Sequence, residues 1–326
     1  MAKVAIIGAG ISGLTCAERL TGAGHACTVF EKSRGLGGRL ATRRAGDLRF
    51  DHGAQYATVR DPDFDAYISS AVDDGKTAVW EGAGRDDPVY VGTPGMSGMV
   101  KSLVGNIDIR LMSRVLGIDE QAGKKRLMVE NKGYVSGFDA VVVAVPSPQA
   151  IELLSDFSAF DLIGSVEVAP CWAGLFAFDE RLPIETDTLR GGETIAWAAR
   201  NGSKPGRDHA QEAWVVHASP EWSKTHLEND KDGMAEPLLT AFYSFSGIKP
   251  IVPTYASAHR WRYAQTEKPL GQPFIFDEAA GIIACGDWCL GRRIEDGFRS
   301  GFAAAEHLET VLDPAPPILP AVGTFG

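Results

Sequence analysis

Cysteine is scarce in this chain, and its few cysteines form neither a disulfide framework nor a metal framework. The 326 residues include five, and these are Cys16, Cys27, Cys171, Cys285 and Cys289. Their number is odd, no C-x-x-C pair occurs, and no set of histidines and cysteines has the spacing of a metal site. These absences argue against a secreted disulfide scaffold and predict free thiols, a reducing compartment and no metal.

Long apolar runs and an excess of positive charge are also missing. No run reaches the roughly 18 apolar residues that a membrane span requires, and the net charge of −10 argues against a nucleic-acid or anionic-membrane partner. The chain passes from Met1-Ala2-Lys3 directly into an apolar strand, so we expect no signal peptide and a cytoplasmic location. The oligomeric state stays open, and a monomer is compatible with the sequence.

A glycine-rich turn near the N-terminus is the most informative feature that is present. An apolar strand leads into Gly8-Ala9-Gly10-Ile11-Ser12-Gly13, and the next strand ends at Glu31, 23 residues after Gly8. Gly8 allows the tight turn, Gly10 lets a pyrophosphate approach the helix N-terminus, and Gly13 lets the helix pack against the strand. Glu31 is placed to bind the hydroxyls of a ribose and would repel a 2′-phosphate, so the pattern predicts NAD or FAD rather than NADP.

A second glycine segment follows at once. Gly37 and Gly38 precede Arg39, which can hold phosphate oxygens with its planar guanidinium. Together with Lys32, Arg34, Arg43 and Arg44, this arginine forms a local basic cluster within the acidic chain. A dinucleotide longer than one binding turn requires a second contact of this kind.

The order of strand, glycine turn, acid and Gly-Gly-Arg resembles the flavin amine-oxidase superfamily. The segments at 50–56 (FDHGAQY) and 259–264 (HRWRYA) resemble the bacterial renalase-like branch, and those at 284–288 (ACGDW) and 294–301 (IEDGFRSG) resemble its last FAD contact. The resemblance implies an α/β fold, with a Rossmann-like FAD-binding domain of the GR2 type on a parallel sheet. An inserted α+β substrate domain on a mixed sheet is expected beside it.

The expected domains are discontinuous along the chain. The FAD-binding domain is predicted at 1–58, 95–148 and 273–312, the substrate domain at 59–94 and 149–272, and a tail at 313–326. The apolar run at 138–145 is typical of a parallel strand buried on both faces. The resemblance and this topology place the active site in a cleft between the two domains.

The resemblance also implies non-covalent FAD and a set of residues that hold it. The motifs near Cys285 and Cys289 do not have the form expected for a covalent link. The strand at Val115 is expected to pass over the adenine, and His52 to lie near the flavin. The predicted cofactor-binding residues are Gly8, Gly10, Ile11, Ser12, Gly13, Glu31, Lys32, Gly37, Gly38, Arg39, His52, Gly53, Ala54, Gln55, Val115, Gly286, Asp287, Asp296 and Gly297.

Candidate catalytic residues come from three segments, and these are Gln55, Tyr56, His259, Trp261, Tyr263 and Trp288. On a strand, His259, Trp261 and Tyr263 share one face, which either lines the cleft or belongs to the core. Many members of the superfamily hold a water at the flavin with a lysine, but no lysine is predicted in such a place here. The turn-rich segment 202–207 is expected to be a surface loop, and His217 a core residue.

The renalase-type resemblance implies an oxidase that takes a hydride from the 2- or 6-dihydro isomers of NAD(P)H. Its products are NAD(P)⁺ and hydrogen peroxide, so the expected partners are a dinucleotide substrate and O₂. The alternatives are an amine or polyamine oxidase, with a cage built from Trp172, Trp197, Trp261 and Trp288, and an FAD protein without catalytic activity. An acid-lined cleft favours the amine, and a basic cleft favours the dinucleotide.

Overall fold

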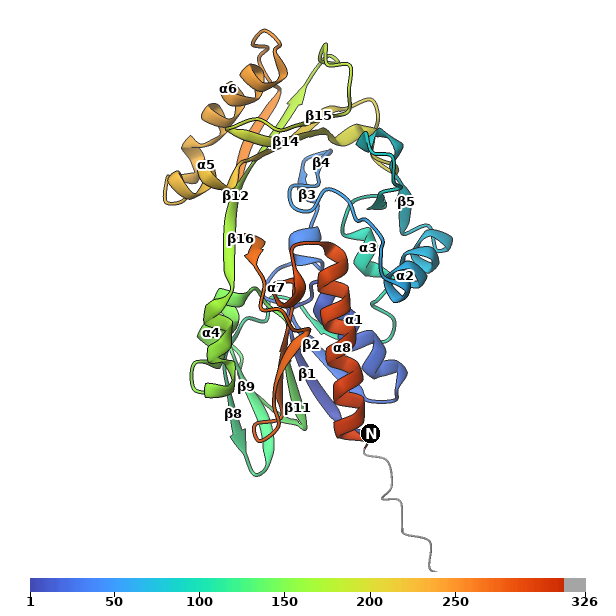
Figure 1. The fold of residues 1–326 in the computed structure, drawn as a ribbon, viewed down its shortest axis with the longest axis vertical. Coiled ribbons are helices and arrows are strands. Elements are labelled where there is room, and N and C mark those ends of the chain that lie inside the picture. The colour runs from blue at the N-terminus through green and yellow to red at the C-terminus, as the bar shows by residue number, and fades with distance from the viewer. Residues whose placement is uncertain (314–326) are drawn as a thin grey trace, which may run out of the picture.

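A computed structural model describes residues 1–313, which form two lobes joined by long strands (Figure 1). The first lobe is built on a six-stranded sheet in the order β17-β18-β11-β1-β2-β7. Its strands are β1 (Lys3–Ile7), β2 (Ala26–Phe30), β7 (Asp108–Arg110), β11 (Ala140–Val143), β17 (Phe274–Asp277) and β18 (Ile282–Cys285). Five strands run parallel, and only the edge strand β17 is antiparallel to its neighbour. The predicted Rossmann-like α/β fold is confirmed.

Both faces of this sheet are covered. Val4 and Ile6 face the core shared with helices α1 (Ile11–Gly22) and α8 (Ile294–Leu312), whereas Ala5 and Ile7 face a second core. That second core includes α4 (Ser147–Leu154) and the antiparallel strands β8 (Val115–Gln121), β9 (Lys124–Val129) and β10 (Gly133–Phe138). Burial on both faces explains why β1 and β11 are apolar without alternation.

The second lobe is a five-stranded sheet in the order β13-β14-β15-β12-β16. Its strands are β12 (Glu167–Phe178), β13 (Thr188–Arg190), β14 (Ile195–Arg200), β15 (Glu212–Ala218) and β16 (Tyr255–Lys268), with α5 (Pro220–Thr225) and α6 (Ala235–Ser246) packed on one face. All four pairings are antiparallel, so the predicted mixed sheet is wrong. Since β15 and β16 both run antiparallel to β12, they run parallel to each other, and the two helices carry the chain across β12 to the edge of the sheet.

The segment between the first glycine motifs and β7 consists of short elements. These are β3 (Arg43–Ala45), β4 (Leu48–Phe50), α2 (Pro62–Asp73), β5 (Thr77–Val79), β6 (Tyr90–Gly92) and α3 (Gly98–Lys101), and a further short helix, α7 (Asp287–Leu290), precedes α8. Phe64 on α2 packs against Phe298 on α8 with ring centroids 5.2 Å apart. The buried Glu295 on α8 accepts the backbone N–H groups of Arg60 and Asp61.

Two predicted domain ranges differ from this packing. The segment 59–94 was assigned to the substrate domain, but Phe64, Ile68 and Val91 lie in the same core as α1 and α8. The segment from 149 to 165 was assigned there too, but Ala150 and Leu154 pack beneath the six-stranded sheet. The tail from residue 314 onward lies outside the described residues. Among the helices described, none is both long and apolar enough to cross a bilayer.

Candidate active site

A cavity of about 1090 Å³ lies where the two lobes meet. It exceeds the roughly 300–1,000 Å³ typical of a site for one small ligand. The predicted cofactor residues that line it are Gly8, Gly10, Ile11, Ser12, Glu31, Lys32, Gly37, Gly38, Arg39, His52, Gly53, Ala54, Gln55, Val115, Gly286 and Asp287. The candidate catalytic residues Gln55, His259, Trp261 and Tyr263 line it as well. One continuous space therefore brings together motifs up to 279 residues apart, from Gly8 to Asp287.

The glycine turn at the end of β1 has the backbone geometry that its sequence predicts. Gly8 has a φ of +109°, and a Cβ there would lie 2.5 Å from the Ala144 carbonyl oxygen. Around Gly10 the space is open, and no side chain among the described residues caps α1 at that position. A Cβ on Gly13 would lie 2.1 Å from the Gly8 carbonyl oxygen, so Gly13 serves helix packing and does not line the cavity. The uncapped N-terminus of α1 is suited to a phosphate.

Glu31 is held at the cavity wall by backbone donors. Its side chain is buried, with Oε2 accepting the N–H of Ala9 at 2.9 Å and Oε1 accepting the N–H of Ser33 at 2.7 Å. An ionised carboxylate has about four acceptor positions, so two stay available for hydroxyl groups. The geometry is suited to a ribose.

Arg39 and Asp287 bind each other across the cavity. The two guanidinium nitrogens lie 2.7 and 2.6 Å from the two carboxylate oxygens. Arg39 was predicted to bind phosphate and Asp287 to lie near the ribityl or pyrophosphate region. Both residues line the cavity, and an anion beside Arg39 would compete with Asp287 for the same donors.

Four other predicted residues lie outside the cavity lining. Asp296 accepts the backbone N–H of Arg293 at 2.9 Å and caps α8, and a Cβ on Gly297 would lie 2.8 Å from Ile11. Trp288 is 1% exposed and donates to the Val145 carbonyl. Tyr56 packs against Trp197, with ring centroids 5.7 Å apart. Each has a structural contact that the motif alone did not reveal.

Three histidines and Trp261 form an aromatic cluster on the cavity wall. The His52 ring centroid lies 4.6 Å from that of His259 and 4.9 Å from that of Trp261. The His52 carbonyl accepts hydrogen bonds from Trp261 Nε1 at 2.9 Å and, where that ring nitrogen is protonated, from His217 Nε2 at 3.1 Å. His217 was predicted to be a core residue, but it lines the cavity.

Burial keeps these imidazoles neutral near pH 7. Desolvation lowers the pKa of His52 to about 3, with further lowering from His259 and Arg43. Desolvation also lowers the pKa of His217 and of His259 to about 4. The cluster therefore presents uncharged aromatic surface to a ligand.

The charged groups around the cavity are mostly basic. Eight are Lys32, Arg34, Arg39, Arg114, Arg260, Arg262, Arg292 and Arg293, and three are Glu31, Glu152 and Asp287. All three acidic residues come from the first lobe, and the five-stranded sheet contributes none to the lining. Arg34, Arg114 and Arg292 pair with no carboxylate within residues 1–313. The cavity is thus electropositive within an acidic protein.

The segment 202–207 is not the surface loop that its glycines and proline predicted. Lys204 is 0% exposed and Arg207 7% exposed, and both bind the buried carboxylate of Asp51. Lys204 and Arg207 hold the pKa of Asp51 well below its usual range, despite the opposing effect of burial. This ion cluster joins residues about 150 positions apart, and no local pattern in the sequence marks it.

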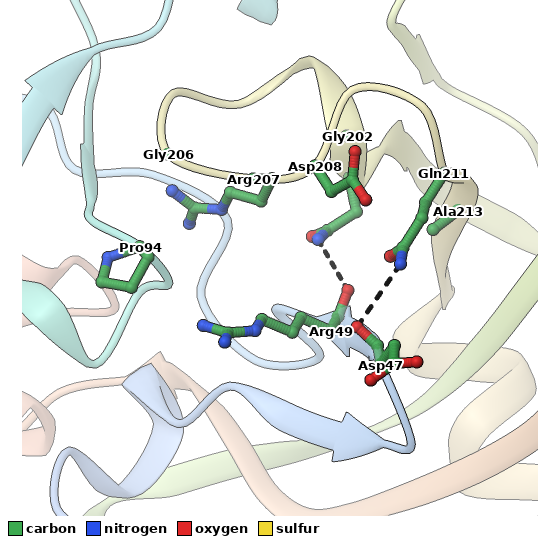
Figure 2. Close-up of a pocket in the computed structure, with 10 residues that line it drawn as sticks. Asp47, Arg49, Pro94, Gly202, Gly206, Arg207, Asp208, Gln211 and Ala213 are labelled. Carbon is green, nitrogen blue, oxygen red and sulfur yellow. Dashed lines mark hydrogen bonds between the residues drawn. The ribbon is translucent and has the colours of Figure 1, made fainter.

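A second cavity of about 470 Å³ lies on the other side of this loop. Figure 2 shows Arg207 and Asp208 on the loop that lies over the β3–β4 hairpin, opposite Asp47 and Arg49. Gln211 Nε2 donates to the Asp47 carbonyl, and Asn201 Nδ2 donates to the Arg49 carbonyl. These bonds hold the loop against the hairpin.

Comparison with known proteins places the chain in a family. The family of flavin containing amine oxidoreductases matches residues 64–308, about three quarters of the chain. The chain belongs to this family. An NAD(P)-binding Rossmann-like domain also matches, over residues 6–70.

Individual relatives are distant. A 4,4'-diapophytoene desaturase of Staphylococcus aureus is 43% identical over 51 residues, which are 16% of this chain and 10% of the relative. A protein described as a protoporphyrinogen oxidase from Exiguobacterium sp. 255-15 has a TM-score of 0.76 at 14% identity, covering 95% of this chain and 99% of its own. A putrescine oxidase variant has a TM-score of 0.66 at 14% identity, covering 94% and 98%. These two likenesses show the fold.

The cofactor is FAD, bound non-covalently. Three features fit its dinucleotide part. The N-terminus of α1 has no side-chain cap among the described residues, the space at Gly10 is open, and the Glu31 carboxylate keeps acceptor positions for hydroxyl groups. Cys285 and Cys289, the thiols beside the last motif, are buried and do not line the cavity. Burial raises the pKa of Cys171, the one cysteine in the lining, to about 12, so its thiol is not ionised near pH 7.

Proposed function

We propose that the protein is a renalase-type oxidase of dihydronicotinamides, acting on the 2- or 6-dihydro isomers of NAD(P)H. In the reaction a C–H bond of the dihydropyridine ring breaks, the ring becomes the aromatic nicotinamide of NAD(P)⁺, and O₂ takes up two electrons and two protons in all to give hydrogen peroxide. One of those protons derives from the transferred hydride and one from solvent. FAD, which Glu31 and the turn at Gly10 would hold, would supply the redox chemistry between the dihydropyridine and O₂.

The charge of the cavity carries this proposal. Basic side chains outnumber acidic ones, and the acidic residues lie on the nucleotide side, where Glu31 and Asp287 already have partners. A substrate with a pyrophosphate gains from such surroundings, whereas a cationic amine is repelled. On the substrate sheet Arg262 and Arg260 are paired with Glu228, at 2.7 and 3.9 Å. The positive charge that is unpaired within residues 1–313 therefore comes from Arg34, Arg114 and Arg292.

The aromatic cluster is compatible with the same chemistry. A dihydronicotinamide already holds the hydride that leaves, so its oxidation requires no strong base. Orientation of the ring is the main requirement. Neutral His52 and His259 with Trp261 offer uncharged aromatic rings to the ligand, with His259 set edge-on to the other two at interplanar angles of 77° and 66°, so a nicotinamide could stack on a single ring.

Steady-state oxidation in air tests the proposal. The FAD-loaded protein would be mixed with borohydride-reduced NAD⁺, which contains the 2-, 4- and 6-dihydro isomers, and separately with pure NADH and a panel of amines. We expect peroxide and NAD⁺ in equal amounts from the mixture, and little peroxide from the others. Peroxide from an amine alone would replace this proposal with the second candidate.

That second candidate is an FAD-dependent amine or polyamine oxidase, and Trp197 and Trp261 favour it by lining the cavity. Trp172 and Trp288, the other two residues of the predicted cage, are 0% and 1% exposed and lie outside the lining. One face of Trp197 is already covered by Arg190, whose guanidinium lies 4.5 Å from the ring centroid.

We place the proposed oxidase in the cytoplasm, because its free thiols suit a reducing compartment.

A further inference from the structure

We propose that Lys204 is a positioning residue that fixes the cavity-facing segment 51–55 through the side-chain amide of Gln55. Lys204 Nζ lies 3.0 Å from Gln55 Oε1 and 3.4 Å from Asp51 Oδ2. The lysine is fully buried and does not line the cavity, whereas Gln55 does. Lys204 therefore acts on the cavity wall from behind.

The ammonium group dictates how the Gln55 amide is turned. Gln55 Nε2 donates to the carbonyl oxygens of Asp51 and Gly53, and its Oε1 accepts from Lys204. An ammonium has donors only, and the two carbonyls are acceptors only. A flipped amide would therefore place donor against donor at Lys204 and acceptor against acceptor at both carbonyls. The charge selects one orientation.

Three consecutive carbonyl groups are held here, two of them by the Gln55 amide. Gln55 binds those of Asp51 and Gly53, while Trp261 and His217 bind that of His52. The backbone here has little room to adjust, since a Cβ on Gly53 would lie 2.0 Å from the Arg39 carbonyl oxygen. A shift of the Gln55 amide is thus transmitted to residues that face the ligand.

Lys204 is not required to neutralise Asp51. Arg207 already binds Asp51 Oδ2 with two nitrogens, at 2.6 and 3.1 Å, and Thr42 and the Met96 N–H bind Oδ1. Two cations thus face one buried carboxylate. Breaking a buried ion pair is costly because it leaves a charge without a partner, but removal of Lys204 leaves Asp51 paired with Arg207. Lys204 also lies over the ring of Trp80, 5.3 Å from its centroid, but Gln55 is the contact that links it to the cavity wall.

Three variants of the holoenzyme test the proposal: Lys204→Met, Gln55→Met and the double variant. Each would be measured for FAD dissociation constant, visible circular dichroism of bound FAD, thermal midpoint, and the rate and substrate dependence of flavin reduction. We expect Lys204→Met to keep its thermal midpoint within a few degrees while altering the dichroism. The reduction rate should fall about tenfold, with a smaller change in substrate affinity. The double variant should match Gln55→Met.

Additive effects in the double variant would overturn the proposal, as would unchanged dichroism in Lys204→Met. Should Lys204→Met not fold, Lys204→Gln would replace it, because it removes the charge but keeps an N–H donor. The proposal then expects an intermediate dichroism change, and a wild-type spectrum would contradict it. Dichroism and FAD affinity involve the cofactor alone, so failure of the proposed substrate leaves this test standing.

Discussion

The two walls of the central cavity are built in different ways. The nucleotide wall consists largely of backbone, namely the turn at Gly8 and Gly10 and the uncapped N-terminus of α1. The opposite wall consists of side chains on β15 and β16, with His217, His259 and Trp261 bound to one another or to His52. The first wall suits a ligand part shared by many proteins, whereas the second is the wall that we propose selects the substrate.

The junction between the walls is where the largest effect is expected. Replacing Asp51 with Asn leaves Lys204 and Arg207 buried without a counter-charge, and breaking a buried ion pair in this way costs about 3–5 kcal/mol. Urea unfolding at pH 7 would measure the loss. The exposed Asp47→Asn is the matched control, for which we expect a change of less than about 0.5 kcal/mol. Equal losses in the two variants would contradict the described cluster.

A methyl group added at Gly13 should disrupt the packing of α1 against the glycine turn of the nucleotide wall. Gly13→Ala places a Cβ 2.1 Å from the Gly8 carbonyl oxygen, so α1 must move away from the turn. We expect a loss of about 1–3 kcal/mol and a weaker hold on FAD, measured by unfolding and by FAD release. In Gly22→Ala, at the open end of the same helix, FAD affinity should not change. FAD binding of wild-type strength in Gly13→Ala would contradict this role.

The histidine cluster on the opposite wall predicts a particular loss of stability in acid. The folded-state pKa of His217 is about 4, below its unfolded value of about 6.5, so the unfolded chain binds more protons between these limits. Stability therefore falls as the pH drops through this window, by at most about 1.4 kcal/mol per pH unit for each such histidine. In His217→Gln, urea unfolding from pH 4.5 to 7.5 should show a shallower decline. A decline as steep as that of the wild type would exclude His217 as a source.

A smaller effect is expected at the rim. Arg292 is exposed, lines the cavity and has no carboxylate partner within residues 1–313. Under the proposed function, Arg292→Ala should raise KM about fivefold with little change in kcat, since a screened surface charge contributes about 1 kcal/mol. Lys249→Ala, which removes an exposed charge outside the lining, serves as control. A fall in kcat with unchanged KM would exclude a role in substrate attraction.

The same comparison explains which features the sequence predicts. The requirement for glycine at positions 8 and 13 is local, because Gly8 has a positive φ in the turn and Gly13 closely approaches the Gly8 carbonyl within one strand–turn–helix unit. Glu31 lies at a fixed spacing from that unit. The Rossmann-like lobe and the dinucleotide part of the site could therefore be predicted from short motifs.

The substrate wall depends on contacts that short motifs do not contain. The cluster of Asp51, Lys204 and Arg207 joins a buried turn to a loop whose glycines and proline are typical of exposed segments. His217 reads as a core residue until its contact with His52 is known. Likewise, β12 pairs antiparallel with β15 and β16, which lie far from it in the sequence. The alternation of side chains within each strand does not predict which strands pair or in which direction.

Anaerobic mixing of the FAD-loaded protein with reductants tests the central claim most directly. The loss of visible flavin absorbance would be followed by stopped flow, with borohydride-reduced NAD⁺, pure 4-dihydro NADH and a panel of amines in parallel. We predict rapid bleaching by the isomer mixture and slow or no bleaching by the other two. Bleaching by an amine alone, or by none of the three, would contradict the claim that this cavity selects a dihydronicotinamide.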